Sequence, residues 1–126
     1  DEYIGRGDFR AAGGRSAMDA LLRLTPRPTA VFAENDLMAL GALSASHAAG
    51  LEIPADLSVV GFDGIAFGAD VTPPLTTVVQ STGAVAAAAV DLLLGQLRNA
   101  QAPPRQVELP VSLAVRGTSA PPPTET

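Results

Sequence analysis

Two polar side chains in this chain each follow an apolar run that has the composition of a buried parallel strand. Asn35 comes shortly after the run at 29–33, and Asp63 directly follows the run at 58–62. Open α/β sheets bind ligands in the crevice at the carboxyl ends of their strands. An amide and a carboxylate there can hydrogen-bond the hydroxyls or ring N–H groups of a small molecule. The pattern therefore predicts one small-ligand site.

Both side chains also have an interpretation that needs no ligand. Asn35 precedes a segment with helical spacing, and its side chain could cap that helix. Asp63 stands directly before Gly64, and an Asx turn into a glycine is common. The residues alone leave both interpretations open.

The residue types present exclude several kinds of covalent and metal chemistry. There are no cysteines, so disulfide and thiolate chemistry are excluded, which fits a reducing cytoplasm. All basic residues are arginines, which excludes Schiff-base and P-loop chemistry, because both need a lysine. His47 is the single histidine and has no metal-binding partner. No nucleophile is paired with a base, so we expect no enzyme activity, no cofactor and no metal.

Length and charge indicate one acidic domain. The chain has 126 residues, 47% of them hydrophobic, and a formal net charge of −5. Its arginines are scattered, so it lacks the basic surface that phosphate backbones require. No apolar run reaches the roughly 18–20 residues needed to span a bilayer, and we expect no membrane partner. The chain starts at Asp1 without an initiator methionine or a signal peptide, which suggests an excised or processed piece.

Strand and helix patterns alternate along the chain and predict an α/β fold with a mostly parallel sheet flanked by helices. Strands are expected at Glu2–Gly5 (the end of one), Thr29–Ala33, Leu57–Phe62 and Leu75–Val79, with short extended pieces at Gln106–Leu109 and Val111–Val115. Helices are expected at Arg15–Leu24, at Leu37–Ala49 with Asp36 as N-cap, and at Thr82–Leu97. A turn-rich loop is expected at 7–14, and an irregular segment that could include a turn of helix at 66–72. The Pro-, Thr- and Ser-rich tail 117–126 is expected to be disordered.

Several blocks, in this order and spacing, resemble the effector-binding core of the lactose-repressor (LacI/GalR) family of transcription regulators. They are 7–9, 35–42, 50–54, 61–63 and 109–113. The resemblance implies the C-terminal lobe of a type I periplasmic-binding-protein-like fold. It would comprise a partial effector-binding and dimerisation domain at 1–116. Within it, 2–78 would form the lobe, 79–111 the crossing segments with one helix that would belong to the missing N-terminal lobe, and 112–116 a return strand.

The resemblance also implies roles for particular residues. Phe9 would stack on an effector ring, with packing as a loop anchor as the alternative, and Asn35 and Asp63 would hydrogen-bond the effector. The family often has a second acidic or amide residue after the aspartate, where this chain has Gly64, so that contact is lost. The dimer interface would include Met38, Leu40 and Val71, for which ordinary core packing is the alternative.

The function implied is the effector-sensing and dimerisation part of a bacterial DNA-binding transcription regulator in the cytoplasm. The effector would be a sugar or a nucleoside-like molecule, and the effect would be allosteric. Operator DNA would be bound only through a missing N-terminal helix-turn-helix, and the partner chain would be a second copy. Two alternatives stay open: a periplasmic sugar-binding protein of a transporter, and a lobe that has lost ligand binding and only dimerises.

Overall fold

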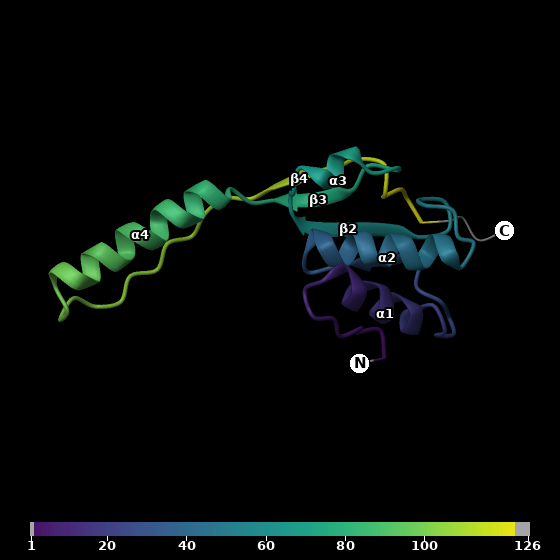
Figure 1. Cartoon of the computed structure of the whole chain (residues 1–126), viewed down its shortest axis with the longest axis horizontal. Coiled ribbons are helices and arrows are strands. Elements are labelled where there is room, and N and C mark those ends of the chain that lie inside the picture. Colours follow the sequence, from purple (N-terminus) through teal and green to yellow (C-terminus); the bar gives the residue numbers. More distant parts are fainter. Residues whose placement is uncertain (1, 123–126) are drawn as a thin grey trace.

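A computed structural model describes residues 2–122 and contains an open four-stranded sheet in the order β1-β2-β3-β4 (Figure 1). The strands are β1 Ala30–Phe32, β2 Ser58–Asp63, β3 Thr76–Val79 and β4 Ser112–Ala114. The first three are parallel, and β4 runs antiparallel to β3. The helices are α1 Ala11–Leu21, α2 Asp36–Ala48, α3 Phe67–Asp70 and α4 Thr82–Arg98. The predicted α/β class with a mostly parallel sheet is confirmed.

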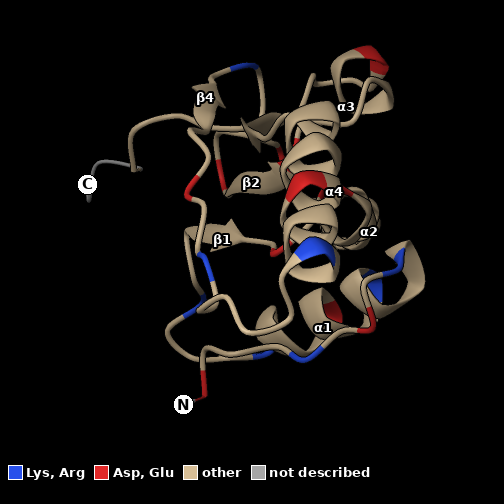
Figure 2. Cartoon of the chain, turned by 90° about the vertical axis from the view of Figure 1, so that its left-hand side faces the viewer, with Lys and Arg blue, Asp and Glu red and all other residues tan. Residues whose placement is uncertain are grey.

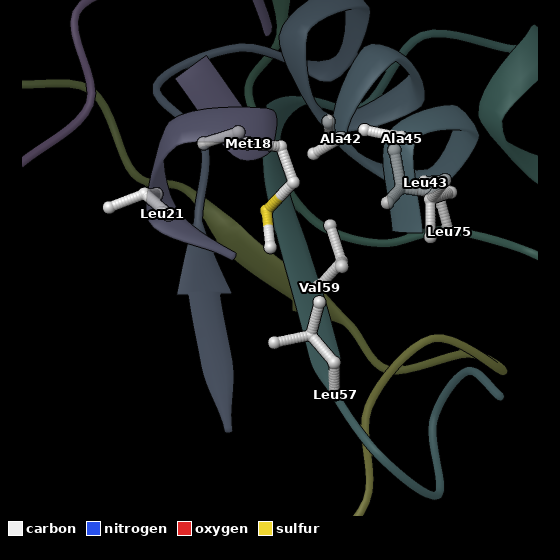
Figure 3. Packing of buried hydrophobic residues seen from close by; sticks show 10 residues of the cluster. Met18, Leu21, Ala42, Leu43, Ala45, Leu57, Val59 and Leu75 are labelled. Atoms are coloured by element: carbon white, nitrogen blue, oxygen red, sulfur yellow. The ribbon is translucent and has the colours of Figure 1, made fainter. Parts of the chain in front are cut away.

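The hydrophobic core lies between the sheet and α2, and α1 packs beside α2 with Met18 directed toward Leu57 and Val59 (Figures 1 and 3). The sheet layer contributes Leu57, Val59 and Leu75, all fully buried. The buried side of α2 is rich in alanine, and α1 adds Met18. Small side chains on α2 allow the helix to lie close to the strands, so that large side chains from the sheet fill the remaining space.

Two glycines bring the backbones of α1 and α2 into direct contact. A Cβ atom at Gly14 would collide with the backbone of Met38, and one at Gly41 would collide with the backbone at Ala11 and Arg15. The helix pair therefore needs glycine at both positions, because no side-chain rotation can relieve a contact with backbone. The prediction that α1 begins at Arg15 is therefore wrong: the helix begins at Ala11 and includes Gly13 and Gly14.

The prediction of a strand at Glu2–Gly5 is wrong. Glu2 and Tyr3 form a turn, and residues 4–8 have no regular structure. A strand needs a hydrogen-bonded neighbour, whereas among residues 2–122 β1 pairs only with β2 and its other edge is open. A cleft of about 980 Å³ lies along that edge, between residues 3–9 and residues 29–34. The extended piece expected at Gln106–Leu109 is likewise not a strand.

The prediction of a disordered tail from Gly117 onward is wrong for its first residues. The Gly117 N–H donates to the Pro74 carbonyl, and Thr118 is fully buried. The Thr118 hydroxyl donates to the Val59 carbonyl and accepts from the Thr76 N–H. The composition predicted disorder because it contains no information about the hydrogen-bond partners that these groups have on β2 and β3. Residues 123–126 lie outside the described residues.

Helix α4 extends away from the sheet, and the segment 99–111 returns along it (Figure 1). No residue of α4 is buried. Apolar side chains are exposed along it, among them Val90, Leu93 and Leu97, and Leu97 is 72% exposed. Among residues 2–122, no helix is long and apolar enough to cross a membrane.

The exposed apolar surface of α4 leads to a prediction of self-association. Contiguous apolar surface of this kind usually marks an interaction site. We expect this 126-residue chain, studied on its own, to be a dimer at micromolar concentration, as measured by light scattering. Leu97→Gln should weaken it about tenfold, because burying one leucine side chain contributes roughly 1.5–3 kcal/mol.

Phe32→Gln is the matched control, since Phe32 is a large apolar side chain on β1 that is 58% exposed. It should leave the dimer unchanged. A monomeric wild-type chain would contradict the prediction, and equal effects of the two substitutions would show that α4 is not the contact.

Candidate functional site

A polar side chain lies at or shortly after the carboxyl end of each of three neighbouring strands. Asn35 follows β1, Asp63 is the last residue of β2, and Gln80 directly follows β3. Because these strands are parallel neighbours, their carboxyl ends lie side by side. All three side chains are half-buried. This edge is where ligands bind in open α/β folds, and it is the candidate site.

Asn35 is the N-cap of α2 and also connects two loops at this edge. Its Oδ1 accepts a hydrogen bond from the Met38 N–H at 2.8 Å. Its Nδ2 donates to the Phe9 carbonyl at 3.0 Å. The capping interpretation of Asn35 is therefore confirmed, and the prediction of Asp36 as N-cap is wrong, because Asp36 is already the first residue of the helix. Asn35 retains a second Oδ1 lone pair and a second Nδ2 hydrogen for a ligand.

Phe9 lies on the loop that Asn35 holds. Its side chain is 62% exposed, so it does not pack into the core as a loop anchor would. It lines the cleft along the open edge of β1. Its backbone has a φ of 62°, in the left-handed region. The ring is therefore accessible at the rim of the candidate site.

Asp63 interacts with the end of the next strand. Its Oδ1 accepts a hydrogen bond from Gln80 Nε2 at 2.7 Å. The Gln80 N–H also donates to the Asp63 carbonyl at 3.3 Å. The hydrogen bond of this carboxylate thus goes to β3 and not to the backbone of an Asx turn, and its other oxygen remains able to accept from a ligand.

Gln80 is not among the residues predicted from the sequence, although a signal for it is present. Gln80 directly follows the predicted strand at 75–79, which is the same pattern that identified Asn35 and Asp63. The rule that ligands bind at the carboxyl ends of parallel strands, applied to this third strand, would have found it.

Backbone conformation distinguishes this edge from the rest of the described chain. Within residues 2–122, the non-glycine residues with positive φ are Phe9, at 62°, and Asp63, at 119°. Such conformations cost roughly 1–3 kcal/mol each and cluster at functional sites. Two candidate ligand residues therefore adopt a backbone conformation that folding alone disfavours.

The three residues expected at a dimer interface are Met38, Leu40 and Val71. All three are half-buried and pack against the hydrophobic core. The Met38 side chain fills the space beside Gly7, where a Cβ atom would come within 2.6 Å of its methyl carbon. Within the described residues, no group of His, Cys, Asp and Glu side chains could hold a metal ion. His47 is exposed in the last turn of α2.

The open, mostly parallel sheet and the polar side chains at the carboxyl ends of its strands are features of a known family. The chain belongs to the family of periplasmic-binding-protein-like domains, whose family model matches residues 1–119. The resemblance to lactose-repressor family regulators is confirmed by the relatives that the chain matches.

One such relative is the HTH-type transcriptional repressor CytR of Escherichia coli strain K12. The chain is 42% identical to it over 118 residues, which are 94% of this chain and 35% of CytR. The chain thus spans about a third of the length of this relative.

Two solved structures have the same fold. The dimeric Lac repressor with an 11-residue C-terminal deletion is 40% identical, with a TM-score of 0.79 over 92% of this chain and 42% of that chain. The complex of the transcriptional regulator CelR with cellobiose is 35% identical, with a TM-score of 0.83 over 90% of this chain and 35% of that chain.

Proposed function

We propose that this chain is the effector-sensing and dimerisation part of a cytoplasmic transcription regulator. The effector, a sugar or a nucleoside-like molecule, would bind at the edge formed by Phe9, Asn35 and Asp63. The observation that carries the proposal is the Asp63 carboxylate. It stands at the end of a central parallel strand, in a disfavoured backbone conformation, with one oxygen held by Gln80. The cellobiose bound to the related CelR supports a sugar as one class of effector.

Regulation would work by linkage between effector and operator. A ligand that binds one arrangement of two lobes better than another shifts the population toward that arrangement. In this proposal, residues 2–78 form one lobe. Residues 79–111 cross to a second lobe, to which they contribute α4, and residues 112–116 return to the first lobe. The exposure of α4 supports this division, because its apolar side chains need a packing partner.

Operator DNA would be bound by a helix-turn-helix outside this chain. Figure 2 shows basic and acidic residues interspersed along the described chain, and the net charge is −5. A transporter's sugar-binding protein shares the fold. The relatives favour a regulator, because CytR and the Lac repressor are transcriptional repressors.

The partner chain would be a second copy. The Lac repressor structure is dimeric, which supports a homodimer here. Met38, Leu40 and Val71 would contribute to the contact. Each is half-buried and retains surface for a partner to cover.

Calorimetric titration of the regulator that contains this chain tests the proposal. Cellobiose, ribose, adenosine and cytidine would be titrated separately, and we expect one of them to bind with one site per protomer. Glycerol serves as the control polyol and should not bind. A dimeric regulator that binds none of the four would favour the alternative of a lobe that only dimerises.

A further inference from the structure

The Asp36 carboxylate is fully buried, and it is not one of the ligand contacts proposed above. Asp36, the first residue of α2, is 0% exposed. One of its oxygens accepts a hydrogen bond from the Ile65 N–H at 2.8 Å, and the other accepts from the Thr77 hydroxyl. Ile65 lies in the turn after β2, and Thr77 lies in β3. The carboxylate therefore joins three elements.

The absence of a side chain at Gly61 leaves the space that this carboxylate occupies. A Cβ atom at Gly61, in the middle of β2, would collide with Asp36 Oδ1. A buried carboxylate without partners is strongly unfavourable, whereas charge-assisted hydrogen bonds and the N-terminus of a helix stabilise one. The two donors and the position at the start of α2 together meet this requirement.

Both groups bound by Asp36 are next to the candidate site. Ile65 is two residues after Asp63, and Thr77 is three residues before Gln80, which donates to Asp63. Asn35, which holds the Phe9 loop, is the residue before Asp36. Asp36 is thus connected to each part of the candidate site, although it is too deeply buried to touch a ligand.

We propose that Asp36 is a positioning residue for the effector site. Through Ile65 and Thr77 it fixes the turn 63–65 against β3, so that the Asp63 carboxylate is held in place before the ligand arrives. A ligand then binds without having to order this turn, which would otherwise reduce its affinity. This inference rests on the proposed function, since it assigns Asp63 to the ligand site.

The substitution Thr77→Val tests this role without placing a new charge or a larger side chain beside the carboxylate. Valine keeps the branched shape of threonine and removes the donor to Asp36, whereas Thr77→Ser keeps the hydroxyl. Thr118→Val is the matched control. Thr118 is also fully buried and hydrogen-bonded, but it contacts Val59 and the start of β3, away from Asp63.

Two measurements are made on the regulator that contains this chain. Hydrogen exchange by mass spectrometry reports the opening of the peptide that includes 63–66. Calorimetry reports the affinity for whichever of cellobiose, ribose, adenosine and cytidine binds the wild type. We expect Thr77→Val to raise exchange about tenfold, which corresponds to the loss of one hydrogen bond to a charged group. Binding should weaken by up to about tenfold, because affinity falls with the fraction of molecules in which the turn is closed. Thr77→Ser should restore both, and Thr118→Val should lower the melting temperature with neither effect.

The possible outcomes separate the two proposals. Unchanged exchange at 63–66 in Thr77→Val, or an equal rise in Thr118→Val, would overturn the positioning role of Asp36. Faster exchange with unchanged affinity would also overturn it, because the turn would then be irrelevant to the ligand. If none of the four compounds binds the wild type, the proposed function fails for these compounds, and the exchange measurement still decides whether Asp36 fixes the turn.

Discussion

Gly41→Ala is expected to lower the free energy of unfolding by about 1–3 kcal/mol, although alanine is the better helix former. Gly41 lies in α2 where that helix crosses α1, and an added Cβ atom would collide with the backbone at Ala11 and Arg15. Backbone atoms cannot move aside as a side-chain end can, so the two helices must separate. Separation would open the layer that covers the buried side chain of Met18.

Chemical denaturation followed by circular dichroism measures this effect. Gly95→Ala is the matched control, because Gly95 is also inside a helix and no atom of the described residues lies within 4 Å of the position of its Cβ atom. It should leave the stability unchanged or raise it by about 0.5–1 kcal/mol, the usual gain from replacing a helical glycine. If Gly41→Ala were as stable as the wild type, the close crossing of α1 and α2 would not exist.

The same pair of helices shows where sequence patterns succeed and fail. The apolar spacing of 37–49 predicted α2 to within one residue at each end, because the exposed positions Leu37, Ser44 and His47 recur at helical spacing and the residues between them are buried or half-buried. The pattern for α1 placed its start at Arg15, since Gly13 and Gly14 usually end or interrupt helices. The actual start at Ala11 depends on the contact of Gly14 with Met38, and no local pattern records a contact between separate elements.

Position relative to the strands predicted much of the candidate site. Asn35 and Asp63 were identified because each follows an apolar run, and their neighbour Gln80 obeys the same rule. Phe9 was predicted as an effector contact only from the family resemblance. In the structure, a hydrogen bond from Asn35 holds the loop of Phe9 at the carboxyl edge of the sheet.

Asp36 could not have been assigned from its surroundings in the sequence. It follows an asparagine at the start of a helix, where an aspartate usually caps the helix or faces solvent. Its partners are Ile65 and Thr77, which are 29 and 41 residues away along the chain. Only the assembled sheet brings these groups together, so the buried role of Asp36 became visible with the fold.

In the intact regulator, Asp63→Ala is expected to weaken effector binding roughly ten- to a hundred-fold while leaving operator binding unchanged. Loss of a charge-assisted hydrogen bond costs about 1.5–3 kcal/mol, which corresponds to that range of affinity. The substitution also removes the acceptor of Gln80 Nε2, so the end of β3 loses a fixed partner. Asp70→Ala is the control, because Asp70 is an exposed carboxylate on α3.

Asp63→Gly separates the ligand role of this side chain from its part in folding. Asp63 has a φ of 119°, which glycine adopts more readily than any residue with a Cβ atom. We therefore expect Asp63→Gly to bind effector as weakly as Asp63→Ala and to melt at a higher temperature than Asp63→Ala. Calorimetric titration and a melting curve for each variant measure the two effects. Wild-type affinity together with a lowered melting temperature in Asp63→Ala would show that this carboxylate serves the fold and not the ligand.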